Sequence, residues 1–294
     1  MRAVPIADII RRRRSCRRYQ EKPIAEETRR LLADFLAVNR SGPFGGRARF
    51  ALVAATAEDR SSLKGLGTYG FIDGASGFIL GAIERSPRDL EDYGYLMERA
   101  ILRATDLGLG TCWLGGSFSK SRFARRLALA EGEQMPAVAA VGYAVEESFA
   151  RDRIRKMAGS SFRRPPQELF FDGAFGTPLS PEDAGAYAGA LELVRWAPSA
   201  SNKQPWRIVR TPAGWHVLLA RTKGYGRGTL MFTMLRMADL QRVDMGIAMC
   251  HFELGAREAG FDGAWVIEDP GIATRQSGVE YIATWREASS AFQG

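Results

Sequence analysis

Residues 197–206 read Ala-Pro-Ser-Ala-Ser-Asn-Lys-Gln-Pro-Trp, and the interpretation of the whole chain starts from this stretch. Pro198 and Pro205 each fix φ and remove a backbone donor, so a helix before them is expected to end near Trp196. The hydroxyl and amide side chains between the prolines can hydrogen-bond local backbone or an incoming polar ligand. The stretch is therefore either a simple loop between a helix and a strand or one wall of a binding site.

The composition is that of an ordinary globular protein, with 46% hydrophobic and 25% charged residues among 294. No apolar run reaches the roughly 18 residues of a membrane helix, and no apolar signal core follows the basic N-terminus, so we expect a cytoplasmic protein. The formal net charge of +8 favours an anionic ligand, either a phosphate, a dinucleotide or nucleic acid.

Cysteine and histidine are too scarce for several classes of chemistry. Cys16, Cys112 and Cys250 are scattered and odd in number, which argues against a disulfide framework and a cysteine metal site. The two histidines, His216 and His251, make zinc hydrolysis and histidine-assisted nucleophilic catalysis unexpected. No side chain is therefore assigned a catalytic role, and no metal ligand is assigned.

Two parts of the chain match each other at a nearly constant offset. The offset is 155 residues for two proline pairs and 152 residues for three later pairs. Matched anchors in one order indicate an internal duplication. We expect a first repeat at residues 1–150, a basic, proline-containing linker at 151–177 and a second repeat at 178–294. The pairs are Pro23 and Pro178, Pro43 and Pro198, Asp92 and Asp244, Gly94 and Gly246, and Trp113 and Trp265.

Each repeat has the same expected order of elements. Apolar spacing predicts a helix around residues 31–36 and another around 187–194, the second introduced by Ser180 as N-cap. Strand-like runs follow at residues 50–55 and 207–210. Residues 92–107 then carry apolar side chains on one broad face, which predicts a largely buried helix.

Residues 11–18 read Arg-Arg-Arg-Arg-Ser-Cys-Arg-Arg. Such runs are usually solvated basic patches or nucleic-acid arms. This one lies between apolar residues and leads directly into Pro23 and a helix, so we expect it to be folded. Guanidinium groups and a serine hydroxyl together match a phosphate monoester.

Residues 108–116 read Gly-Leu-Gly-Thr-Cys-Trp-Leu-Gly-Gly and follow the expected buried helix. A dinucleotide-binding fingerprint needs its glycines between a strand and the start of a helix, so that interpretation is rejected. The glycines are typical either of a plain turn or of a backbone that must approach a ligand closely.

These three segments together resemble the nitroreductase family of flavin-dependent NAD(P)H oxidoreductases, in particular members with two repeats fused in one chain. The resemblance runs from about residue 6 to residue 285. It implies an α+β fold in which the two repeats mimic the family homodimer, with antiparallel-rich sheets around a central helical interface. It also implies FMN as cofactor, NADH or NADPH as electron donor, and ping-pong reduction of a small organic acceptor such as a nitroaromatic or a quinone, with the flavin carrying the chemistry.

The resemblance also assigns the cofactor-binding residues. One pattern, Arg-x-Ser-x-Arg, holds the FMN phosphate, and the basic residue inside it is expected at the flavin ring. The glycine segment at residues 108–116 faces the flavin N5 edge, and the stretch at residues 197–206, called the Pro-Ser loop from here on, lies against the ring. A basic pair reaches the phosphate, although a linker between two domains would have the same basic, proline-containing sequence. Ala200 stands where the family often has serine. The expected phosphate ligands are Arg13, Ser15 and Arg17, and Arg14 is expected at the ring. The glycine segment contributes Leu114, Gly115 and Gly116, and the Pro-Ser loop contributes Pro198, Ser199, Ala200 and Asn202. The basic pair is Arg163 and Arg164.

The two repeats are not equivalent, because the first has Pro-Phe-Gly-Gly-Arg at residues 43–47 and the second lacks an arginine cluster. We therefore expect one FMN site per chain in a monomeric pseudo-dimer. Residues 68–75 and 221–232 are candidates for the variable acceptor pocket. Two alternatives stay open: a non-catalytic flavin-binding or flavin-less relative, and a nucleic-acid-binding protein, although the chain has no helix-turn-helix, zinc-finger or aromatic RNA-binding motif.

Overall fold

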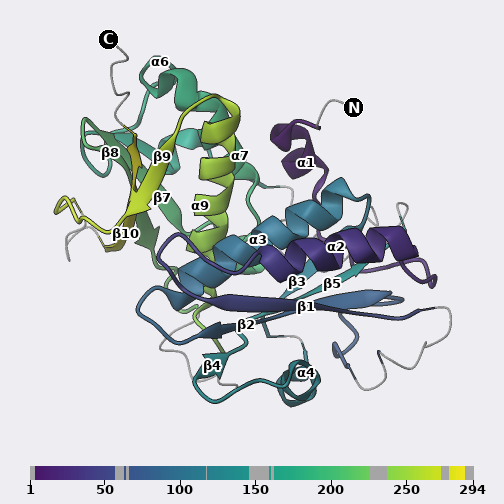
Figure 1. Cartoon of the computed structure of the whole chain (residues 1–294). Helices are drawn as coiled ribbons and strands as arrows, with labels where there is room; N and C mark the ends of the chain where they lie inside the picture. Colours follow the sequence, from purple (N-terminus) through teal and green to yellow (C-terminus); the bar gives the residue numbers. More distant parts are fainter. Residues whose placement is uncertain are drawn as a thin grey trace, which may run out of the picture.

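The structure is a computed structural model that describes residues 4–56, 63, 66–116, 118–145, 159, 162–225, 237–272 and 278–288. Two long helices, α3 (Asp89–Asp106) and α9 (Leu240–Glu258), pack against each other in its centre, and each belongs to one half of the chain. Figure 1 shows a β-sheet beside each of them. This arrangement confirms the α+β fold with a central helical interface.

The two sheets have the same order of corresponding strands. In the first, β1 (Ala48–Ala54), β2 (Gly77–Glu84), β5 (Val138–Gly142) and β3 (Gly110–Leu114) are neighbours in that order, all antiparallel. In the second, β7 (Trp206–Thr211), β8 (Gly214–Ala220), β10 (Val279–Glu287) and β9 (Gly263–Val266) repeat this order. A short strand, β4 (Glu133–Gln134), also pairs with β2.

Helices cover both faces of the first sheet. Figure 1 shows α2 (Glu26–Val38) and α3 on one side of the first sheet and α4 (Lys120–Leu127) on the other. In the second half, α6 (Pro181–Ala184) begins where the hydroxyl oxygen of Ser180 accepts the N–H of Asp183 at 3.0 Å. The following α7 (Ala188–Trp196) packs on α9 and ends at Trp196, as the prolines predict.

The buried helix expected at residues 92–107 is α3, which ends before Gly108. Gly108 has φ +80°, a left-handed conformation that ends a helix easily only when the residue has no side chain. The chain then enters β3, so the glycine-rich segment starts at the C-terminal end of a helix, as the sequence indicates. Among the helices in the described ranges, none is both long and apolar enough to cross a bilayer.

The segment expected as a linker also takes part in the second sheet. After a turn of 3-10 helix, η3 (Pro166–Glu168), it forms strand β6 (Phe170–Asp172), which pairs with β7 in parallel. The segment between the two halves therefore contributes a strand to the edge of the second sheet. Helix α1 (Ile6–Arg12), in turn, contacts α7 and α9 of the second half.

Candidate functional site

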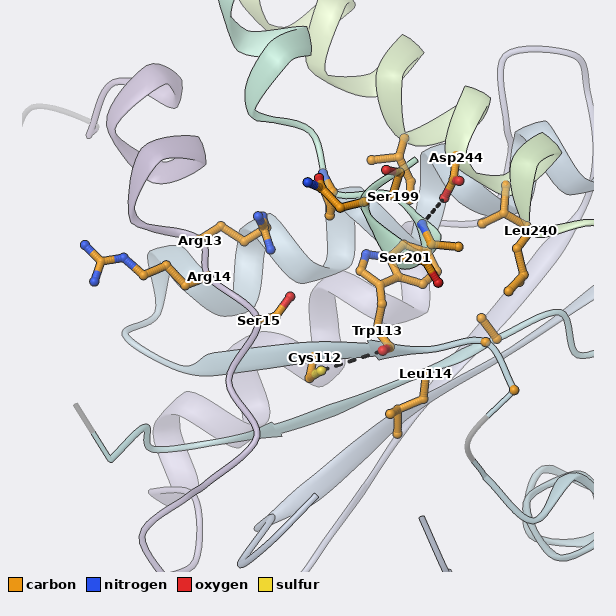
Figure 2. A pocket seen from close by; sticks show the side chains of 18 of the residues that line it. Arg13, Arg14, Ser15, Cys112, Trp113, Leu114, Ser199, Ser201, Leu240 and Asp244 are labelled. Carbon is orange, nitrogen blue, oxygen red and sulfur yellow. Dashed lines mark hydrogen bonds between the residues drawn. The ribbon is translucent and has the colours of Figure 1, made fainter. Parts of the chain in front are cut away.

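A cleft of about 620 Å³ lies where the two halves meet, and the three segments singled out in the sequence line it together (Figure 2). Its size falls within the range of small-molecule sites, roughly 300–1,000 Å³. Of the thirteen residues expected to bind the cofactor, all but Arg164 line this cleft: Arg13, Arg14, Ser15, Arg17, Leu114, Gly115, Gly116, Arg163, Pro198, Ser199, Ala200 and Asn202.

The arginine-rich segment is folded along the edge of β3. The Cys16 N–H donates to the Thr111 carbonyl at 2.8 Å, and the Tyr19 N–H donates to the Asp73 carbonyl at 2.9 Å. Arg13 is 8% exposed, and Ser15 beside it faces the cleft in Figure 2. A segment fixed by backbone hydrogen bonds is pre-organised for a ligand, whereas a nucleic-acid arm is expected to be loose.

Arg14 is placed differently from its neighbours. Its side chain is exposed, and in Figure 2 it extends away from Trp113 and from the Pro-Ser loop. Arg14 still lines the cleft. Its expected contact with the flavin ring stays a prediction.

The Pro-Ser loop forms the opposite wall and is held by its own polar groups. The Ser199 hydroxyl oxygen accepts the N–H of Gln204 at 2.9 Å, and Asp244 Oδ1 accepts the N–H of Ala200 at 3.0 Å. Ser201, Asn202 and Gln204 have φ of +50°, +53° and +50°. Such values are uncommon outside glycine, and strained backbone of this kind tends to occur at functional sites.

The glycine segment allows the end of β3 to approach α9. A Cβ atom on Gly115 would collide with the side chain of Leu240, and one on Gly116 would collide with the end of the Met237 side chain. A side chain at position 115 would therefore push Leu240 out of its present place in the cleft wall. Leu114 just before it is 3% exposed and forms part of the cleft wall.

The two arginines of the former linker segment go to different places. Arg163 lines the cleft and its guanidinium donates to Asn202 Oδ1 at 3.2 Å, which ties it to the Pro-Ser loop. The guanidinium of Arg164 donates to Glu168 at 2.7 Å on the partly exposed η3 turn. Arg164 is therefore the one expected cofactor ligand that the structure does not bring to the cleft.

Several cleft residues were not identified from the sequence. Leu240, Val243 and Ile247 come from one face of α9, and Trp113 and Trp196 add aromatic walls. The spacing of the three α9 residues is that of a helical stripe, a signal that was available but reads equally well as ordinary core. Phe71 and Tyr225, from the two candidate acceptor segments, also line the cleft, while residues 226–232 lie outside the described ranges.

Asp244 is the acidic residue of the cleft wall and is 3% exposed. Burial raises the pKa of its carboxyl well above the ordinary value, and the charge of Asp239 adds to this, although the N–H of Ala200 favours the ionised form. Burial at this wall therefore disfavours the ionised form of the Asp244 carboxyl. Across the described part of the chain, no three His, Cys, Asp or Glu side chains are grouped to hold a metal.

The corresponding place in the first half is arranged differently. Asp92 accepts two N–H groups of the facing loop, that of Phe44 at 2.9 Å on Oδ1 and that of Gly46 at 2.6 Å on Oδ2. A Cβ atom on Gly42 or Gly46 would collide with the Asp92 side chain. The loop at residues 42–46 therefore packs directly on the carboxylate, whereas Asp244 receives a single N–H from the Pro-Ser loop.

Comparison with known proteins agrees with the fold. The family model described as "Putative TM nitroreductase" matches residues 5–256. A "putative nitroreductase" from Thermotoga maritima MSB8 has a TM-score of 0.58 at 19% identity, over 98% of this chain and 94% of that chain. A "putative nitroreductase in complex with fmn" from Desulfovibrio desulfuricans is 26% identical over 48% of this chain and 87% of that chain, with a TM-score of 0.38.

The search of curated proteins found no match. The match of the family model over most of the chain nevertheless establishes the family, and the Thermotoga maritima structure shares the fold over nearly the full length of both chains. The chain belongs to the nitroreductase family.

Proposed function

We propose that this protein is an FMN-dependent oxidoreductase that takes hydride from NADH or NADPH and reduces a small organic acceptor, a nitroaromatic or a quinone, by a ping-pong route. Family membership supports an oxidoreductase, and solved relatives include a nitroreductase in complex with FMN and an oxidoreductase containing FMN. The observation that carries the proposal is the convergence of the arginine-serine segment, the glycine segment and the Pro-Ser loop on one cleft.

The residues of the cleft fit FMN in both charge and shape. Arg13, Ser15 and Arg17 would hold the phosphate, since guanidinium groups match its oxygens and carry the opposite charge. Leu114 on one side and the Leu240 face of α9 on the other would enclose a flat ring. Gly115, directly after β3, keeps the backbone free of a side chain at this point.

Bound FMN would supply the hydride transfer itself, and the chain would bind, orient and shield it. The half-buried Pro-Ser loop and the apolar face of α9 would exclude water from one side of the ring, while Phe71 and Tyr225, which also line the cleft, would face the acceptor. A reaction in which the flavin carries the chemistry needs no catalytic pair that contains histidine or cysteine, and this agrees with the scarcity of both residues.

We further propose that residues 1–150 and 178–294 are two repeats that act as a pseudo-dimer with one flavin site. The equal strand order of the two sheets supports the duplication. The loop that packs on Asp92 supports the loss of the second site, because Phe44 and Gly46 occupy both oxygens of this carboxylate.

Anaerobic stopped-flow absorbance of the purified protein loaded with FMN tests the proposed activity. NADH or NADPH should bleach the flavin band in the first mixing step, and a nitroaromatic or a quinone should restore it in the second. Protein that retains FMN but is bleached by neither nucleotide would contradict the proposal and would favour a non-catalytic flavin-binding relative.

A further inference from the structure

A buried polar cluster lies beneath the cleft where α3 and α9 meet. Glu98 and His251 are both 0% exposed, and Glu98 Oε1 lies 2.9 Å from His251 Nε2. The other oxygen, Oε2, accepts the indole N–H of Trp113 at 2.8 Å. The guanidinium Nε of Arg13 lies 3.8 Å from Glu98 Oε1. Two members of the cluster, Arg13 and Trp113, also line the cleft.

Hydrogen bonds connect this cluster to both central helices and to α7. His251 Nδ1 lies 2.9 Å from the Leu193 carbonyl oxygen, which can only accept, so Nδ1 carries a proton. Burial alone would raise the pKa of Glu98, but His251, Arg13 and the Trp113 N–H hold it below its ordinary value. The other ring nitrogen, Nε2, faces Glu98 Oε1, so His251 connects α7 to Glu98 of α3 through both sides of its ring.

The contacts of Glu98 have a direct consequence for the cleft. His251 and the Trp113 indole hold the two oxygens of the Glu98 carboxylate in place, and this carboxylate lies beside the Arg13 guanidinium. A guanidinium stays protonated in proteins, so Arg13 brings a positive charge to the cleft while the carboxylate orients its side chain. Buried ion pairs add little net stability on their own, which makes a role in the site the better explanation for this one.

The second half of the chain also contains a hydrogen-bonded pair of a tryptophan and a glutamate, but without a buried histidine and a buried arginine beside it. The indole N–H of Trp265 donates to Glu253 Oε2 at 2.9 Å. Glu253, however, pairs with Arg257 at 2.8 Å, a side chain that is 44% exposed, and these three residues are not part of the cleft wall. A tryptophan–glutamate pair therefore occurs in both halves, but the one beside the cleft is combined with a buried histidine and a buried arginine.

We propose that Glu98 and His251 are positioning residues that hold Arg13 oriented toward the phosphate of the flavin ligand, with Trp113 fixed beside it. This inference rests on the proposed function, since it takes FMN as the ligand. It assigns roles to two residues 153 positions apart that meet across the interface of the two halves.

The test compares FMN with riboflavin, which has the same ring and sugar chain but no phosphate. Dissociation constants would be measured by flavin fluorescence for the wild type, Glu98→Gln, His251→Gln and the matched control Glu253→Gln. The variants Glu98→Gln and His251→Gln should each bind FMN roughly tenfold or more weakly, because the charge-assisted contact of Arg13 with the phosphate is misplaced. Their riboflavin affinity should stay within about twofold of the wild type, because riboflavin lacks the phosphate on which that contact acts. Glu253→Gln should bind both flavins like the wild type.

The outcomes separate this inference from the proposed function. Equal losses for FMN and riboflavin would show that Glu98 and His251 only support the structure, and unchanged FMN affinity would show that they do not act on Arg13; either result overturns the inference alone. A wild type that binds neither flavin overturns the proposed function as well. If Glu98→Gln does not fold, as judged by circular dichroism, His251→Gln gives the same comparison.

Discussion

Gly94 of α3 lies against the backbone of Val243 in α9, and Gly246 of α9 lies against the backbone of Glu91 in α3. Gly246 follows Gly94 by 152 residues, and Val243 follows Glu91 by the same number. The contact of Gly94 with α9 and the contact of Gly246 with α3 therefore involve corresponding residues of the two helices. The two central helices are related by an internal two-fold arrangement that matches the offset found in the sequence.

This contact predicts that alanine is not tolerated at either glycine. A Cβ atom at Gly94 or Gly246 would overlap a backbone carbonyl oxygen of the facing helix, so the helices would have to separate. We expect Gly94→Ala and Gly246→Ala each to lower the free energy of unfolding by about 1–3 kcal/mol, by similar amounts. Chemical denaturation measures both.

Gly189 in α7 offers the matched control, because a Cβ atom there meets no neighbouring atom within 4 Å. Gly189→Ala should be neutral or should raise the free energy of unfolding by up to about 1 kcal/mol, since alanine favours a helix over glycine. Equal effects of all three substitutions would refute the close approach of α3 and α9.

The phosphate assignment predicts that Arg17 and Arg18 differ sharply although they are neighbours. Arg17 lines the cleft, whereas Arg18 pairs with Asp73 at 3.4 Å on the exposed surface. Loss of a charge-assisted bond costs about 1.5–3 kcal/mol, so Arg17→Ala should weaken FMN binding by roughly 10- to 100-fold. Isothermal titration of FMN should find Arg18→Ala close to the wild type. Unchanged affinity in Arg17→Ala would mean that the phosphate lies elsewhere.

Asp92 predicts a pH dependence of stability. Burial raises the pKa of its carboxyl to about 6 in the folded protein, although the N–H groups of Phe44 and Gly46 favour ionisation, while the ordinary value is 3.8. A raised pKa means that the folded state binds this proton more tightly than the unfolded state. The stabilisation is complete below pH 3.8 and is lost as the pH rises toward 6, by about 3 kcal/mol in all.

The variant Asp92→Asn isolates this contribution, because asparagine does not titrate. Urea unfolding at pH 4 and at pH 7 should show that the wild type loses more stability over this interval than Asp92→Asn does, by up to about 3 kcal/mol. The same change in both proteins would contradict a raised pKa at Asp92.

The residues that the sequence identified are those whose chemistry is contained in a short run. Pro198 ends α7 through its own ring, and Gly108 ends α3 through its backbone conformation. The local sequence was therefore enough to predict the C-terminal ends of both helices. The arginine-serine segment and the Pro-Ser loop were found in the same way. Their meeting in one cleft was expected from the family resemblance rather than from their spacing.

What the sequence did not indicate depends on contacts across the chain. Glu98 and His251 are 153 positions apart, and each by itself is an ordinary helical residue until α3 and α9 pack together. Arg163 and Arg164 are adjacent, yet Arg163 lines the cleft while Arg164 pairs with Glu168, and the sequence does not distinguish them. Strand β6 was unexpected because its partner β7 lies more than thirty residues further along the chain.

The number of flavins bound per chain tests the central claim most directly. Purified protein would be saturated with FMN and freed of excess, and the flavin released by denaturation would be counted against the protein concentration. The account predicts about one FMN per chain, because the loop at residues 42–46 packs on Asp92 while the Pro-Ser loop leaves a cleft beside Asp244. Two FMN per chain would contradict it.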